Sequence, residues 1–163
     1  MLFRSAGASN AGHSHSDLKN LTEPVRVSQD VRAEGLAVPQ GDMMIVHLPP
    51  FPHSFASMGI YPSLAERRYA FEFPCEFKSD LEIKLSLPEG YEVAWLPRDV
   101  TLTTPDAVLE LTCESDESQH AVVWKQSVTV NERSIDVDNY NEFKESYDTL
   151  VSPKSRLILL KKA

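Results

Sequence analysis

Cysteine, histidine and aspartate occur in this sequence in the chain order that some thiol hydrolases use: Cys75, His120, and then Asp136 or Asp138. A nucleophilic thiol needs a lowered pKa and a histidine within hydrogen-bond reach. Cys75 lies instead in an alternating, strand-like segment, on the side that carries the apolar residues. Because apolar surroundings raise the pKa of a thiol, we expect a packed cysteine and no enzyme activity. A thiol hydrolase that uses Cys75 and His120 is the alternative.

The second cysteine, Cys113, also falls on the apolar side of an alternating segment. Two cysteines are too few for a disulfide framework. Free cysteine is among the most buried residue types, so we favour two buried free thiols. A disulfide between Cys75 and Cys113 stays open, and it would require Cα atoms within about 7 Å.

Histidines suggest a metal site only weakly. His13 and His15 would need His47 or His53 as a further ligand. Two histidines without a third ligand and a rigid frame do not define a metal site. The chain also lacks a glycine-rich phosphate loop and a nucleophile elbow. We therefore expect no metal and no cofactor.

Composition bounds the class of protein. The 163 residues carry a formal charge of -8 and are 42% hydrophobic, which suits a globular domain with a real core. Negative charge opposes binding to nucleic acid and to anionic lipid. No apolar run approaches the roughly 20 residues of a membrane span, and the N-terminal stretch shows no apolar core of a signal peptide.

The order of patterns predicts one domain after a tail. Residues 1–22 are rich in Ser, Gly, Ala, Asn and His and predict a flexible tail, and residues 23–163 predict a single domain. Many short alternating segments with turn residues between them indicate an antiparallel β-sandwich of about seven to nine strands. The expected strands lie near residues 25–31, 42–48, 69–77, 81–87, 91–95, 100–102, 107–113, 121–130 and 156–160.

Two of these segments show the alternation most clearly. In 69–77 the inward set is Tyr69, Phe71, Phe73, Cys75 and Phe77, and in 81–87 it is Leu81, Ile83, Leu85 and Leu87. The polar residues 78–80 between them predict a tight turn. Two later segments add the inward sets Ala107, Leu109, Leu111 and Cys113, and Val122, Trp124, Val128 and Val130, the last interrupted by Gln126.

One helix is expected near the end. Tyr140, Phe143, Tyr147 and Leu150 recur at helical spacing. Asn139 with Glu142 resembles a capping box, and negative charge at Asp136 and Asp138 suits a helix start. The helix therefore precedes the last strand.

Three connecting segments have structural explanations that compete with functional ones. Residues 49–66 form a long loop in which Phe51, Phe55, Met58, Ile60 and Tyr61 either mark a partner surface or cover an open end of the sandwich. The acidic residues 114–119 predict a solvated hairpin end. The stretch Leu87–Tyr91 predicts a corner between strands, in which Pro88 ends a ladder and Gly90 permits the turn.

From Arg67 onward the chain resembles the C-terminal β-domain of bacterial exported proteins that also carry an N-terminal domain of unknown function and a transglutaminase-like domain. The resemblance rests on the order of short motifs: Arg67 or Arg68 before a strand, Leu87, Pro88, Gly90 and Tyr91 at a corner, Leu96 and Pro97 closing a strand, Tyr140 and Phe143 on a helix, and Ile158, Leu159 and Lys161 at the end.

What the resemblance implies is an accessory domain. No residue here matches the catalytic positions of the transglutaminase-like domain, so no catalytic role carries over. We expect a non-enzymatic domain that binds protein or glycan through loops or an edge strand, with a precursor that is periplasmic or extracellular. A structural domain that packs against a sister domain of a longer chain is a further alternative.

Overall fold

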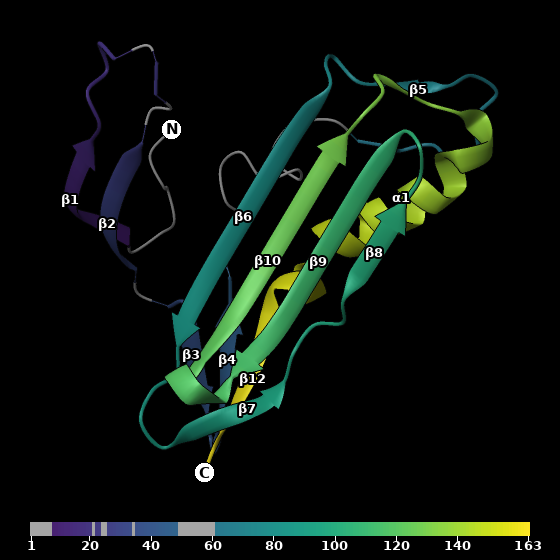
Figure 1. Cartoon of the computed structure of the whole chain (residues 1–163). Helices are drawn as coiled ribbons and strands as arrows, with labels where there is room; N and C mark the ends of the chain where they lie inside the picture. The colour runs from purple at the N-terminus through teal and green to yellow at the C-terminus, as the bar shows by residue number, and fades with distance from the viewer. Residues whose placement is uncertain (1–7, 21, 24–25, 34, 49–60) are drawn as a thin grey trace.

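The computed structural model describes residues 8–20, 22–23, 26–33, 35–48 and 61–163. Within them the chain forms twelve strands in antiparallel sheets and one α-helix before the last strand (Figure 1), which confirms the predicted fold class. The total of twelve strands exceeds the expected seven to nine, and two four-stranded sheets hold eight of them. The other four strands form two small two-stranded sheets.

The first four-stranded sheet, called the long sheet below, has the strand order β6-β10-β9-β8. Its strands are β6 (Phe77–Ser86), β8 (Val100–Thr103), β9 (Ala107–Asp116) and β10 (Ala121–Val130). Alternation places the apolar side chains of β9 and β10 inward, and all those predicted for these two strands are buried. A short 3-10 turn at Glu117–Gln119 joins β9 to β10, so the acidic segment is an exposed hairpin end, as predicted.

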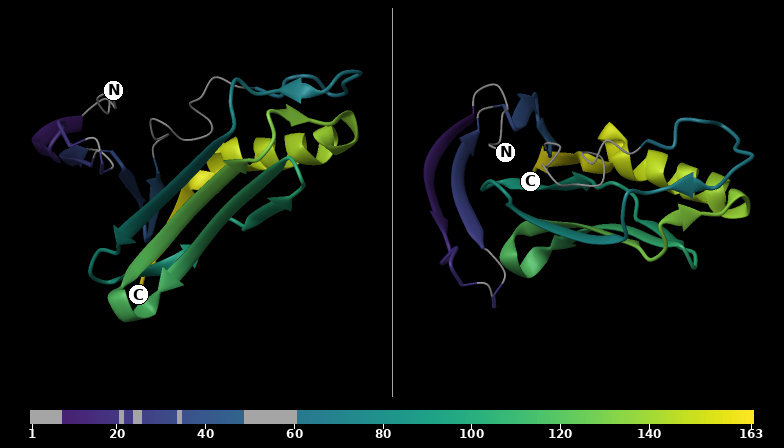
Figure 2. Two further views of the ribbon diagram at one scale, coloured as in Figure 1. Left: turned by 45° about the horizontal axis from the view of Figure 1, so that its top comes forward. Right: turned by 90° about the horizontal axis from the view of Figure 1, so that it is seen from above.

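The second layer has two parts. The second sheet has the order β3-β4-β12-β7, with β3 (Ala37–Gln40), β4 (Met43–His47), β7 (Tyr91–Trp95) and β12 (Leu157–Lys162). It covers one end of the long sheet, and α1 (Val137–Val151) covers the other (Figures 1 and 2). The helix thus covers the part of the long sheet that the four short strands of the second sheet do not reach.

One apolar core joins these layers. It combines inward residues of the long sheet with side chains of β4, β12 and α1, among them Val46, Leu109, Leu111, Trp124, Tyr140, Phe143, Ile158 and Leu160. The buried face of α1 consists of the four residues that the helical spacing predicted.

The start of α1 differs from the predicted cap. The helix begins at Val137 with Asp136 at the N-cap position, and Asp136 makes no side-chain capping bond. Asn139, predicted as the cap, lies in the first turn, and its amide donates to Asp106 Oδ2 at 2.9 Å. The capping-box assignment was therefore wrong by three residues. No helix among the described residues is long and apolar enough to cross a bilayer.

The segment expected to be one strand near Cys75 is divided. β5 (Phe71–Glu72) pairs with β11 (Ser134–Ile135), and β6 begins only at Phe77. Pro74 lies at the break, and proline cannot donate to a ladder. Residues 78–80, predicted as a turn, continue β6 instead.

This division changes which side chains are buried. Phe71 and Phe73 are buried as predicted, whereas Tyr69 is 82% exposed and Cys75 is exposed. The predicted inward positions of Tyr69 and Cys75 were therefore wrong, because the chain bends at residues 68–69 before β5 and at residues 74–75 after it, and the alternation runs through neither bend.

The N-terminal region contains a hairpin. β1 (Ala8–His15) pairs with β2 (Val27–Ala33) in an antiparallel ladder that stands apart from the two large sheets in both views of Figure 2. The predicted tail, residues 1–22, thus includes a strand. Its flexibility stays a prediction, and residues 1–7 lie outside the described residues.

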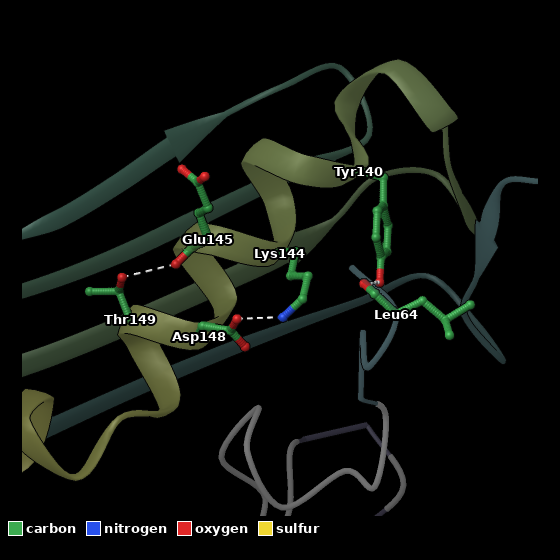
Figure 3. A network of polar contacts seen from close by, with 6 residues as sticks. All are labelled: Leu64, Tyr140, Lys144, Glu145, Asp148 and Thr149. Atoms are coloured by element: carbon green, nitrogen blue, oxygen red, sulfur yellow. Dashed lines mark hydrogen bonds and ion pairs between the residues drawn. The ribbon is translucent and has the colours of Figure 1, made fainter. Parts of the chain in front are cut away.

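The segment that leads to β5 is attached to α1. The Tyr140 hydroxyl donates to the Leu64 carbonyl at 2.8 Å (Figure 3), and the Arg67 guanidinium lies 5.2 Å from the Phe71 ring centroid. Tyr61 is exposed. The rest of the predicted apolar loop, residues 49–60, lies outside the described residues.

Candidate functional site

The structure does not bring together the residues predicted for a thiol hydrolase. Cys75 precedes the start of β6, and His120 lies beside the other end of the β6–β10 ladder. The ten residues of β6 lie between them, about 30 Å of strand at roughly 3.3 Å per residue. Asp136 lies at the start of α1. A proton cannot pass directly from Cys75 to His120 over that length.

His120 has a local structural role. It ends the turn after β9 in a left-handed conformation, with φ of 47°. Its carbonyl accepts the Leu87 N–H at 2.9 Å, and its Nε2 lies 3.4 Å from the Pro88 carbonyl. The corner at Leu87–Tyr91 is a strand-to-strand turn as predicted, with Gly90 at a φ of 75°. These contacts join the hairpin end to the corner.

The two cysteines are free and lie far apart. Cys113 is buried opposite Trp124, which lies opposite Ile83 on β6. Cys75 precedes Phe77, about 20 Å of strand from Ile83 at ~3.3 Å per residue, so a disulfide is not feasible. Burial raises the pKa of Cys113 to about 12, and the negative charges of Asp99 and Glu114 add to the effect.

The histidines predicted as weak metal ligands are dispersed. His13 and His15 lie on the exposed hairpin strand β1, His47 is on β4, and His53 lies outside the described residues. Within the described ranges, no three His, Cys, Asp or Glu side chains are grouped closely enough to hold a metal ion.

The feature with the clearest binding geometry is β6. Within the described part of the chain, β6 pairs with β10 alone, so its other side is an edge of the long sheet. The strand has ten residues and contains neither proline nor glycine. An edge strand of this kind is a template for pairing with another extended segment.

One hydrogen bond fixes which peptide groups of β6 face that edge. The Leu87 N–H donates to the His120 carbonyl, one step beyond the β6–β10 ladder. Bonded residues alternate in an antiparallel ladder, so odd-numbered residues of β6 bond to β10 and even-numbered residues face away. The outward-facing peptide groups belong to Lys78, Asp80, Glu82, Lys84 and Ser86. We call this set the open edge.

The side chains of the open edge carry charge on the outer face of the sheet. Lys78 Nζ lies 3.2 Å from Asp80 Oδ2, and Lys125 Nζ of β10 lies 3.2 Å from Glu82 Oε2. The Ser127 hydroxyl donates to Asp80 at 2.7 Å, and with Lys78 it holds the pKa of Asp80 below its usual value. The edge therefore displays fixed positive and negative positions to any strand beside it.

The inner face of β6 is only partly covered. Leu81, Ile83 and Leu85 are half-buried, whereas their neighbours Val122 and Trp124 on β10 are buried to 2% exposure or less. An apolar rim therefore accompanies the open edge. An added strand would cover both the peptide groups and this rim.

Sequence reasoning named an edge strand as a binding element but did not identify β6. The alternation in 81–87 was visible, but nothing in it shows whether one or two strands flank the segment. The length of the edge was also hidden, since residues 78–80 suggested a turn.

The comparisons with known proteins agree with this fold. A family model described as "Domain of Unknown Function with solved-structure structure (DUF3858)" matches residues 42–160. Among solved structures, the chain is similar to one described as the crystal structure of a "putative protease" from Parabacteroides distasonis, with a TM-score of 0.61 and 16% sequence identity. A search of curated proteins finds no match.

The structural likeness is partial in length. It covers 73% of this chain and 23% of the Parabacteroides protein, so the chain spans about a quarter of that protein. At this identity the likeness shows a shared fold.

Proposed function

The chain belongs to the DUF3858 family, whose function is unknown, and from this premise we propose that it is a non-enzymatic interaction domain. It binds an extended segment of a partner protein along the open edge of β6. The observation that carries the proposal is the run of outward-facing peptide groups from Lys78 to Ser86, beside a half-buried apolar rim. Strand addition gives affinity through main-chain hydrogen bonds and specificity through alternate side chains.

A polypeptide suits this edge better than a glycan does. The open edge repeats N–H and C=O groups at the spacing of a strand, which another strand matches. The charges of the outer face favour a segment with opposite charges in register, and they oppose indiscriminate pairing. The partner is therefore an extended, alternating segment rather than a sugar.

The absence of enzyme activity is part of the proposal. The separation of Cys75 from His120 supports it, and so does the buried, high-pKa thiol of Cys113. The sequence resemblance suggests the identity of the partner. A domain of this kind would serve a transglutaminase-like domain, in the same chain or a neighbouring one.

The test uses a designed strand as the probe. An acetylated and amidated peptide, Thr-Glu-Val-Lys-Val-Lys-Val-Glu-Thr, places opposite charges against Lys84, Glu82, Asp80 and Lys78 in an antiparallel register. Amide hydrogen exchange of the full chain is measured by NMR with and without the peptide. We expect slower exchange at the even-numbered residues of β6 and little change at the odd-numbered ones, which are already bonded to β10.

Two proline variants provide the matched control. Glu82→Pro removes an outward-facing N–H from the open edge, and it should weaken peptide binding at least about tenfold through lost hydrogen bonds and a misshapen edge. Thr101→Pro makes the same change at the opposite edge of the sheet and should leave binding unchanged. Binding that survives Glu82→Pro, or protection outside β6, would overturn the proposal.

A further inference from the structure

A second feature, independent of the open edge, is a groove between the end of β7 and the C-terminal end of α1. Its volume is about 470 Å³, within the range of small-molecule sites. Pro97 and Arg98, which line it, belong to the connection from β7 to β8. The groove is therefore on the β8 side of the long sheet, away from β6.

A register shift in the β12–β7 ladder places an aromatic wall in this groove. Leu159 lies opposite Trp95 and Leu160 lies opposite Val93, so Ala94 is an extra residue on β7. Such a bulge bends a strand and redirects its side chains, and bulges are frequent beside functional sites. Trp95 is 38% exposed and lines the groove.

The base of the groove is fixed by the core. The Trp124 Nε1–H donates to the Ser155 carbonyl at 2.8 Å. The Ser155 hydroxyl lies within hydrogen-bond distance of the Leu150 and Ser152 carbonyls, at 2.8 and 2.7 Å. The Ser155 hydroxyl thus provides a donor for the Leu150 carbonyl near the C-terminal end of α1, where helix carbonyls lack intrahelical partners. These contacts attach the base of the groove to the core.

The side chains at the groove leave a positive excess. Arg98 and Lys154 line it and are exposed, and no ion pair involving either is found among the described residues. The carboxylate on the lining, Asp148, lies 2.5 Å from Lys144 Nζ (Figure 3). In a chain with a formal charge of -8, two such cations beside an apolar wall favour an anionic ligand.

We propose that this groove binds a small organic anion, an aromatic or otherwise apolar body that carries one carboxylate. The body packs against the Trp95 indole, where a flat ring gains area and stacking. The carboxylate binds the Arg98 guanidinium and the Lys154 ammonium through charge-assisted hydrogen bonds. A free aromatic acid and the C-terminal residue of a polypeptide share this chemistry.

The experiment compares probes that differ only in charge. 3-Phenylpropionate and 3-phenylpropionamide are titrated into the full chain, and the indole N–H signals are followed by NMR. The chain has two tryptophans, so the spectrum of Trp95→Ala assigns the two signals. We expect the acid to shift Trp95 and to bind about tenfold more tightly than the amide, the factor expected for a charged hydrogen bond. N-acetylphenylalanine is the third arm, and tighter binding than phenylpropionate assigns the site to a polypeptide end.

Variants test separately the packing of the ligand against Trp95 and the binding of its carboxylate by Arg98 and Lys154. Trp95→Ala should abolish binding of the acid, followed by the Thr149 amide signal, with the Trp124 signal reporting an intact fold. The double change Arg98→Gln and Lys154→Gln should remove the preference for the acid. Lys125→Gln, on the outer face of β10, is the charge-matched control and should change nothing. Equal binding of acid and amide, or no binding of either, would overturn the assignment.

Discussion

β6 and β8 form the two edges of the same sheet, yet they leave very different lengths of backbone open. β6 has ten residues, whereas β8 has four and lies between Pro97 and Pro105. The Thr104 N–H donates to the Ala107 carbonyl at 2.9 Å, so even-numbered residues of β8 bond to β9. In β8 only the peptide groups of Thr101 and Thr103 then face away from β9. In β6 five peptide groups, those of the open edge, face away from β10.

β8 is too short to pair with the whole of β9, and a side chain takes the place of the missing strand. The Cys113 N–H points toward the β8 side, and Asp99 Oδ1 accepts it at 3.2 Å. Helix α1 also contacts β8. The comparison teaches that local features decide whether an edge is open: the short length of β8, a capping carboxylate and a covering helix protect it. β6 is bounded by prolines as β8 is, at Pro74 and Pro88, but no capping carboxylate is found beside it among the described residues.

The largest expected effect is the difference in reactivity between the two thiols, one beside β6 and the other beside β8. Cys75 is exposed just before β6, and Cys113 is buried beside the capped end of β8. The pKa of Cys113 rises from 9.0 to about 12, which lowers its thiolate fraction near pH 8 about a thousandfold. A native thiol titration at pH 8 should therefore count one reactive thiol per chain.

The titration in denaturant, with Cys75→Ser and Cys113→Ser as controls, should count two reactive thiols in the parent chain. Raising the pH from 8 toward 10 should increase the native reactivity of Cys113, because its thiolate fraction grows about tenfold per pH unit below its raised pKa. Two thiols that react rapidly in the native chain at pH 8 would mean that the β8 side of the sheet opens readily. No reactive thiol under these conditions would mean that Cys75 is covered.

A pair of proline variants tests directly which alternate residues of β6 bond to β10. Ile83→Pro removes an N–H that bonds to β10 and truncates a half-buried side chain, so it should lower the free energy of unfolding by about 3 kcal/mol. Glu82→Pro removes an outward-facing N–H, a position that edge strands tolerate, and should cost about 1 kcal/mol from strain and the lost exposed ion pair. Urea unfolding of both variants measures the difference. Equal losses would contradict the alternation inferred from Leu87 and His120.

Much of the fold could be predicted from periodicity. The inward faces of β9, β10 and α1 follow from alternate or helical spacing, since each of these elements buries one face. Periodicity failed at Cys75, because Pro74 bends the chain and alternation carries no information across a bend. It failed again at residues 78–80, whose polar character suggested a turn although they continue an edge strand.

The binding features were less accessible to sequence reasoning, for a physical reason. An edge is defined by the strands that are missing beside it, and strand order depends on contacts between distant segments. Trp95 and Arg98 were visible as residues near Pro97, but the bulge that exposes Trp95 arises from its pairing with β12. The groove also needs Lys154, which is distant in sequence.

The smallest expected effect tests whether Asp99 closes the β8 edge. Asp99→Ala removes the acceptor of the Cys113 N–H and should lower the free energy of unfolding by about 1 kcal/mol. Asp99→Asn keeps an acceptor but removes the charge, so most of that stability should remain. Both variants remove the negative charge of Asp99, so the pKa of Cys113 should fall modestly in each, since burial is the larger cause of its elevation.

Amide hydrogen exchange at Cys113 tests whether Asp99 is what protects the β8 edge, in contrast to the open edge of β6. In Asp99→Ala the Cys113 N–H loses its protein acceptor, and it should exchange as the outward-facing amides of β6 do. In Asp99→Asn it should stay slow. If exchange at Cys113 stays slow in Asp99→Ala as well, the carboxylate is not what protects this edge. The difference between β6 and β8 would then rest on the shorter length of β8 and on α1.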